Sequence, residues 1–215
     1  MKSDVDTLKA DYQQSAKLTL TLQDKYGNPI VTSDHLEFVQ SGPFVNFLKL
    51  SDIDYSQRNY GEYTVTVTGG KEGTATLIPM LNGVHQANLS VSLNLILSIK
   101  EMSGHVTANN HTFSTAKFPS EGFAGAYYTL NNDNFEAGKT VDDYMFSSSQ
   151  SWVSVDASGK VSFANIGDQT SVTISAVPRQ GGTTYQTLIK LKGWWVNNGN
   201  HTNIWLAANA LCHAK

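Results

Sequence analysis

The alternation of apolar and polar residues is strictest in Lys17-Leu18-Thr19-Leu20-Thr21-Leu22-Gln23. A period of two puts successive side chains on opposite faces, which predicts a β-strand with one buried face. The strand runs into Asp24-Lys25-Tyr26-Gly27-Asn28-Pro29, where glycine and proline supply turn geometry. An alternating strand closed by such a turn is typical of an all-β fold.

The rest of the first half repeats this arrangement of strand and turn. Further strands are expected at 36–39, 62–68, 74–81 and 87–93. Asn82-Gly83 separates the last two and is a strong short hairpin signal. Strands at this spacing, with turn signals between them, indicate a β-sandwich or a barrel.

The second half begins with the apolar run Leu95-Ile96-Leu97-Ser98-Ile99, so the linker around Asn94 is expected to be short. Strands are then expected at 123–130, 144–147, 153–155, 160–163, 171–177 and 185–192. Helical periodicity occurs only near the C-terminus, where Ile204 and Leu211 share one face. The chain is therefore expected to form two tandem immunoglobulin-like β-sandwiches, residues 1–94 and 95–193, followed by a short helical tail over 194–215.

Composition excludes several classes of protein. Hydrophobic residues make up 40% and charged residues 15%, and the formal net charge is −3 without visible clustering. A nucleic-acid partner is therefore not expected, because such proteins present a basic face. No apolar run reaches the roughly 18 residues of a membrane-spanning helix. The single cysteine, Cys212, cannot form a disulfide within the chain, and we expect a monomer held together by packing.

Two segments resemble bacterial immunoglobulin-like repeats. Leu18 to Val31 resembles the first type, in which an alternating strand runs into Asp-x-x-Gly-Asn-Pro. Ser151 to Phe163 resembles the central hairpin of the second type, and Val172-Thr173-Ile174-Ser175-Ala176 matches the strand that follows it. The order of the two types, followed by Trp194-Trp195-Val196-Asn197-Asn198-Gly199 and an alanine-rich helix with a cysteine, is similar to the C-terminal region of the intimin/invasin-family adhesins, which are inverse autotransporters.

The resemblance implies a fragment of a bacterial cell-surface adhesin that attaches to host cells or extracellular matrix through a protein or glycan receptor. The immunoglobulin-like domains would form a stiff rod that presents a tip. Residues 194–215 would be the truncated start of a C-type-lectin-like domain, with Cys212 as half of a disulfide whose partner is absent. Attachment to the outer membrane would come from an N-terminal barrel absent from this chain.

The sequence contains no constellation typical of catalysis. Ala137-Gly138-Lys139-Thr140 imitates the end of a phosphate-binding loop, but Asp133 stands where that loop requires glycine. The six histidines show no zinc-ligand spacing. Asp52-Ile53-Asp54 and Asp142-Asp143 could offer oxygens to calcium, but isolated pairs are more simply solvated loop carboxylates. We expect no enzyme activity, no cofactor and no metal site.

The aromatic residues leave two alternatives open. Trp194, Trp195 and Trp205 would form a sugar-stacking platform if exposed together, or would pack the second sandwich against a following domain. The second alternative is favoured. The first would fit a carbohydrate-binding or spacer module of a secreted polysaccharide-degrading enzyme. The aromatic residues within predicted strands are expected to be core: Tyr63, Phe123, Tyr127, Phe146, Trp152 and Phe163.

Overall fold

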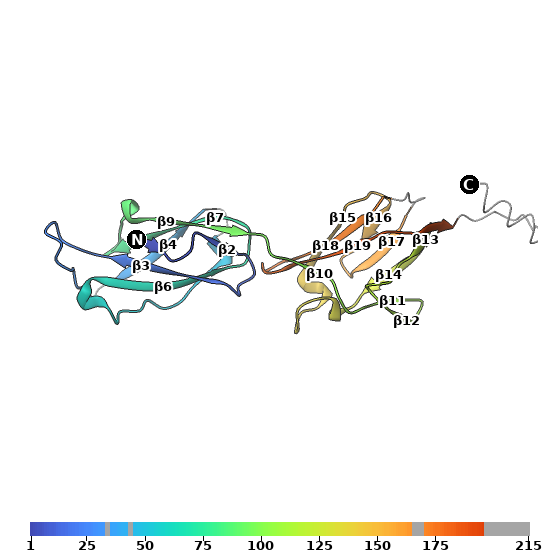
Figure 1. Cartoon of the computed structure of the whole chain (residues 1–215), viewed down its shortest axis with the longest axis horizontal. Helices are drawn as coiled ribbons and strands as arrows, with labels where there is room; N and C mark the ends of the chain where they lie inside the picture. Colours follow the sequence, from blue (N-terminus) through green and yellow to red (C-terminus); the bar gives the residue numbers. More distant parts are fainter. Residues whose placement is uncertain (33–34, 43–44, 165–169, 196–215) are drawn as a thin grey trace, which may run out of the picture.

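The chain folds into two β-sandwiches that follow one another end to end (Figure 1). The computed structural model describes residues 1–32, 35–42, 45–164 and 170–195. The helical elements in these residues are five short 3-10 turns: η1 (Val45–Phe47), η2 (Arg58–Tyr60), η3 (Ala87–Leu89), η4 (Asn132–Asn134) and η5 (Val141–Asp143). This tandem of sandwiches confirms the all-β class. The predicted helical tail lies outside the described residues.

Domain 1 packs two sheets face to face. The first sheet contains, in spatial order, β1 (Lys2–Ser3), β3 (Ser15–Thr21), β6 (Glu62–Gly69) and β5 (Leu48–Leu50). The second contains β2 (Thr7–Lys9), β9 (Val91–Ile96), β7 (Gly73–Leu81) and β4 (Leu36–Ser41), with β8 (Val84–His85) paired to the end of β7.

Domain 2 is built in the same way around a larger aromatic core. One sheet contains β10 (Ile99–Glu101), β19 (Thr184–Ile189), β18 (Val172–Pro178) and β15 (Tyr144–Ser148). The other contains β12 (His111–Ser114), β11 (His105–Ala108), β14 (Tyr127–Leu130), β17 (Lys160–Phe163) and β16 (Val153–Val155). A separate pair is formed by β13 (Glu121–Phe123) and β20 (Gly193–Trp195).

The alternation that predicted β3 determines which of its side chains are buried. Leu18 and Leu20 are fully buried, whereas Lys17 between β3's apolar positions points to solvent. Strand β6 opposes β3 in antiparallel register, with Leu18 opposite Val65 and Leu20 opposite Tyr63. Buried side chains on two paired strands therefore build one wall of the domain 1 core.

An aspartate organises each of the two turns on which the family resemblance depends. Asp24 accepts hydrogen bonds from the amide and side chain of Asn28 and from the amide of Tyr26, each 2.8–2.9 Å long. Asp156 accepts from the amide and hydroxyl of Ser158 and from the amide of Lys160. The side-chain hydrogen bonds, from Asn28 and Ser158 respectively, do most to hold both carboxyl pKa values below their ordinary range. The loops are thus true Asx turns.

The hairpin predicted at Asn82-Gly83 is present, but its return strand differs from the expectation. Both turn residues have positive φ (50° and 78°), as a tight hairpin turn with the strand twist requires. The return strand begins as β8, is interrupted by η3, and resumes as β9 on the same edge of β7. The strand predicted over 87–93 was therefore wrong in its first half, because the chain makes a 3-10 turn there.

The apolar run 95–99 and the strand predicted over 123–130 are each divided. Within 95–99, Leu95 and Ile96 end β9 while Ile99 begins β10, so the run is shared between two strands rather than forming one. Within 123–130, a turn closed by the amide of Ala126 and the carbonyl of Phe123 separates β13 from β14. The break in 123–130 falls at Gly125, whose positive φ (89°) marks a turn that the predicted strand overlooked.

The aromatic residues predicted as core divide into two groups. Tyr63, Trp152 and Phe163 are buried, and Phe146 packs against the core of domain 2. Phe123 and Tyr127 are instead exposed, at 54% and 47% of their surface. Their strands alternate with the opposite phase, so that Gly122 and Tyr128 face inward. The Tyr127 ring lies on the outer surface under the Lys160 ammonium, 4.0 Å away.

Tyr63→Phe should lower the free energy of unfolding of domain 1 by about 1–3 kcal/mol, since each hydrogen bond contributes roughly 0.5–1.5 kcal/mol. The fully buried Tyr63 hydroxyl accepts the Thr32 amide at 2.7 Å and donates to the Ile30 carbonyl at 3.1 Å. Urea titration followed by far-UV circular dichroism measures the change. Tyr60→Phe is the control, because that ring is 70% exposed. Equal stability of the two variants would contradict the expectation.

Candidate functional site: the joint between the domains

The most distinctive site in the described residues is the joint, formed by the linker Leu97–Ser98, the turn 179–183 of domain 2 and the turn 69–72 of domain 1. Only Leu97 and Ser98 separate β9 from β10. The Ser98 hydroxyl donates to Asp11 Oδ2 at 3.2 Å, and the Ser98 carbonyl accepts the Thr184 amide at 2.9 Å. The buried Ser98 therefore bonds the linker to both domains, which leaves it little slack, while Leu97 is exposed.

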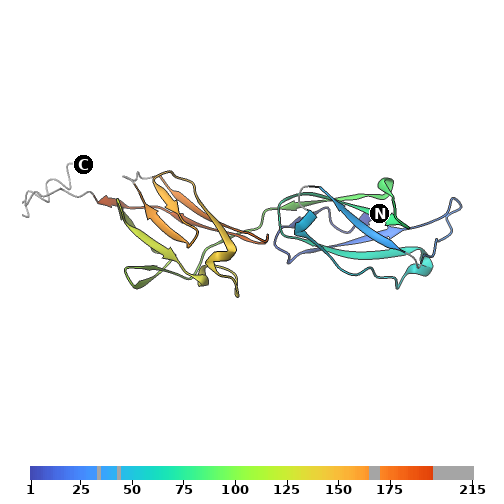
Figure 2. The same cartoon turned by 180° about the vertical axis from the view of Figure 1, so that it is seen from behind.

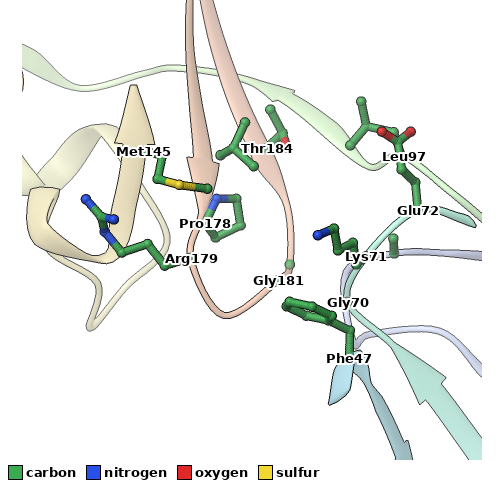
Figure 3. Close-up of a pocket in the computed structure, with 13 residues that line it drawn as sticks. Phe47, Gly70, Lys71, Glu72, Leu97, Met145, Pro178, Arg179, Gly181 and Thr184 are labelled. Carbon is green, nitrogen blue, oxygen red and sulfur yellow. The ribbon is translucent and has the colours of Figure 1, made fainter. Parts of the chain in front are cut away.

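The turn between β18 and β19 lies directly against the end of domain 1. The Gly182 amide donates to the Gly70 carbonyl at 2.6 Å, and the Tyr12 hydroxyl donates to the Gln180 carbonyl at 3.1 Å. Figure 3 shows Gly181 at the tip of this hairpin, facing Gly70 and the Phe47 ring. Two hydrogen bonds between segments far apart in sequence thus fix one domain on the other.

Close approach of the two backbones requires glycine on both sides. A Cβ atom at Gly70 would lie 2.1 Å from the Tyr12 ring. At Gly181, whose φ is +75°, a Cβ would lie 2.5 Å from the Gly70 carbonyl oxygen and 2.9 Å from Phe47. Both contacts are shorter than van der Waals distance. A side chain at Gly181 would push the domains apart, whereas one at Gly70 would displace the Tyr12 ring, whose hydroxyl bonds to domain 2.

Tyr12 is held in place by its own backbone and by a neighbouring charge. It has a left-handed φ of 60°, and its amide donates to the Gly69 carbonyl at 2.9 Å. The Lys49 ammonium lies 4.4 Å from the ring centroid, a cation–π contact. Burial raises the pKa of Tyr12, so the hydroxyl stays protonated and able to donate to Gln180 at neutral pH.

A pocket of about 120 Å³ opens beside this contact, with walls from both domains. Its apolar lining includes Leu97, Met145 and Val177, and charged side chains of Lys71 and Arg179 also line it (Figure 3). Pockets that enclose a small-molecule ligand usually measure 300–1,000 Å³. The space is therefore a small crevice between the two docked domains.

The two predicted site tryptophans that the structure describes have different environments. Trp194 is half-buried and meets Trp152 and Phe163 edge to face, with ring centroids 5.8 and 6.1 Å apart. Trp195 is 58% exposed, and its indole N–H donates to the Glu121 carboxylate. Because neighbours on a strand face opposite ways, the two rings do not form a common platform. Trp205 and Cys212 lie outside the described residues.

The other candidate sites are built as turns. Asp54 accepts the Ser56 amide at 2.8 Å, and Asp143 accepts the Thr140 amide at 2.8 Å. Within the described residues, no group of three or more His, Cys, Asp or Glu side chains could hold a metal ion. In the same part of the chain, no helix has the length and apolar character of a membrane span.

The joint itself was not anticipated, although its residues carry a weak signal. Gly69-Gly70 and Gly181-Gly182 stand at strand ends, where a single glycine would satisfy a turn. A second glycine at each place indicates close approach of another backbone. The sequence gives no means of telling that the two pairs meet each other, because that contact joins residues 112 positions apart (Gly70 and Gly182).

Two family models match the chain in sequence. The model described as invasin domain 3 matches residues 1–96, and that described as invasin domain 4 matches residues 104–189. The inverse autotransporter adhesin YeeJ of Escherichia coli K12 is 53% identical over 216 residues, which cover 100% of this chain and 9% of that protein. The chain thus spans about a tenth of the length of this curated relative.

Solved structures share the fold. The crystal structure of invasin, described as a bacterial integrin-binding protein, superimposes with a TM-score of 0.53 at 24% identity, covering 100% of this chain and 43% of that one. The Yersinia pseudotuberculosis adhesin InvE gives 0.51 at 18% identity, covering 88% of this chain and 57% of that one. With both domains matched in order, the chain belongs to the intimin/invasin family, and its two domains match the models of invasin domains 3 and 4.

Proposed function

We propose that the chain is a rod segment of a bacterial surface adhesin, which attaches the cell to a host cell-surface or extracellular-matrix protein or glycan. The joint carries this proposal, because a two-residue linker and a docked hairpin hold the sandwiches in line. Such a segment extends reach without bending. YeeJ, which is 53% identical in sequence, is named an adhesin, and this supports the same function.

The proposal also includes the cellular location of the segment. We propose that it lies at the bacterial surface, held at the outer membrane by a part of the protein outside this chain. Its domains are those predicted as 1–94 and 95–193, with the boundary moved to the linker Leu97–Ser98 because β9 runs to Ile96. Residues 194–215 would open a lectin-like domain in which Cys212 forms a disulfide. Trp195 supports this reading, because a large ring 58% exposed at the last described strand offers a surface on which a following domain can pack.

The alternative, an accessory carbohydrate-binding module, is not favoured. Its binding platform needs exposed, neighbouring rings, whereas Trp194 packs against Trp152 and Phe163 in the domain 2 core. We also propose that the chain is not an enzyme and that it is monomeric. The relatives named above are adhesins, which agrees with a role in binding.

A solid-phase adhesion assay tests the proposal. The chain, and a version extended through the following domain, should be coated separately and offered to host cells and to purified matrix proteins. We expect the extended version to bind above a heat-denatured control. If neither version binds and both are retarded on a glycan affinity gel, with the retardation lost in Trp195→Ala, the accessory-module alternative replaces the proposal.

A further inference from the structure

The second strand of domain 1 pairs in parallel with its last strand, after the two-residue β1 has paired with β3. Strand β2 lies beside β9 with Thr7 opposite Asn94 and Lys9 opposite Ile96. The Asn94 amide donates to the Asp6 carbonyl at 3.0 Å, and the Ala10 amide donates to the Ile96 carbonyl at 2.8 Å. The chain therefore enters this pair at the start of β2 and leaves it at the opposite end of the pair, at the end of β9.

Domain 2 repeats the arrangement. Strand β10, its first, pairs in parallel with β19, with Ile99 opposite Thr184. The ladder is extended at both ends, by the Thr184 amide to the Ser98 carbonyl at 2.9 Å and by the Met102 amide to the Gln186 carbonyl at 2.7 Å. Beyond β19 the chain forms β20, which again lies parallel to its partner, β13.

This geometry decides how the strands separate under tension. When a force pulls along the axis on the start of one strand and the end of its parallel partner, the two strands slide past one another. All hydrogen bonds of the ladder are then strained together, whereas strands pulled apart sideways lose them one at a time. Figures 1 and 2 show β9 running along the long axis of the molecule toward domain 2, so axial tension acts along the strand.

We propose that the chain has a second, mechanical function: it transmits tension through two shear clamps in series, β2/β9 in domain 1 and β10/β19 in domain 2. Because only Leu97 and Ser98 separate β9 from β10, tension leaving the first clamp enters the second directly. The biological role of the two clamps rests on the proposed function, because an attached cell in flow pulls on its adhesin. The mechanical property itself does not depend on adhesion.

Single-molecule pulling in two directions tests the clamp of domain 1, in the full chain with Cys212→Ser. In one variant, handles are attached through Asp6→Cys, directly before β2, and Ile96→Cys, so that β2 and β9 are drawn past each other. In the other, Gln13→Cys replaces Asp6→Cys, so that both handles lie at the same end of the clamp. All three side chains are exposed. At equal pulling rate, the first direction should need a several-fold higher force.

The corresponding pair for domain 2 is Ile99→Cys with Lys190→Cys, against Ile99→Cys with Gln180→Cys. Urea titration of all four variants provides the control, because equal free energies of unfolding show that only direction differs. Equal forces in the two directions, for both domains, would overturn the proposal. Failure of the solid-phase adhesion assay with the force difference intact would overturn the adhesin role and leave the clamps standing.

Discussion

Phe163→Ala should remove about 3–5 kcal/mol from the free energy of unfolding of domain 2 and leave domain 1 unchanged. The ring is 2% exposed and lies at the centre of an aromatic cluster. It stacks on Trp152 with centroids 6.0 Å apart, meets Trp194 edge to face, and lies 6.5 Å from Tyr128. Truncation would leave a cavity between rings too rigid to collapse into it.

Intrinsic fluorescence separates the two domains in this experiment. All four tryptophans lie beyond domain 1, at positions 152, 194, 195 and 205. A urea titration followed by tryptophan emission therefore reports domain 2, while hydrogen exchange of β3 and β6 amides reports domain 1. Leu77→Ala, at a fully buried site of domain 1, is the matched control and should destabilise that domain by about 2–5 kcal/mol. If Phe163→Ala shifts both signals equally, the domains unfold as one unit and the prediction is wrong.

The long strands were predictable because their alternation of buried and exposed side chains follows directly from the alternation of apolar and polar residues in the sequence. Strands β3, β6, β7 and β18 match the ranges expected for them to within two residues at each end. Each has a buried face that alternates with less buried positions, and a turn follows each of them. Local sequence is sufficient where local geometry and burial agree.

Short edge strands were missed because they carry little pattern of their own. Strand β1 has two residues and β2 has three, too few for a period to be recognised. They exist because a neighbouring strand offers unpaired hydrogen-bonding groups. The hairpin of β11 and β12 did leave a signal, since Asn109 and Asn110 both adopt positive φ (48° and 64°), as consecutive asparagines readily do.

The parallel strand pairs and the joint between the domains could not be predicted from sequence pattern. Parallel pairing of β2 with β9 joins residues almost a domain apart, and nothing in either strand specifies its direction. The same holds for the joint, where Gly182 finds Gly70 only after both sandwiches have formed. Family resemblance predicted a stiff rod, but the contacts between the domains could be identified only from the structure.

Gly181→Ala should release the hairpin of domain 2 from domain 1 without unfolding either domain. The new methyl group would meet the Gly70 carbonyl oxygen at 2.5 Å, so the backbones must move apart. That movement breaks the bonds from the Gly182 amide and the Tyr12 hydroxyl, each contributing roughly 0.5–1.5 kcal/mol. A total of about 1–3 kcal/mol shifts the equilibrium between docked and undocked joints by roughly one to two orders of magnitude.

Gly83→Ala isolates the effect of the joint from the strain of the backbone. Gly83 has nearly the same φ as Gly181, +78° against +75°, but a Cβ there meets nothing within 4 Å. Both variants therefore carry the cost of a side chain in the left-handed region, about 1–2 kcal/mol, and only one disturbs the contact between domains. Distance distributions between spin labels, one on each domain, should broaden in Gly181→Ala and stay narrow in Gly83→Ala. If both variants keep the narrow distribution, the two-residue linker alone stiffens the rod, and the docked hairpin is not what holds the domains in line.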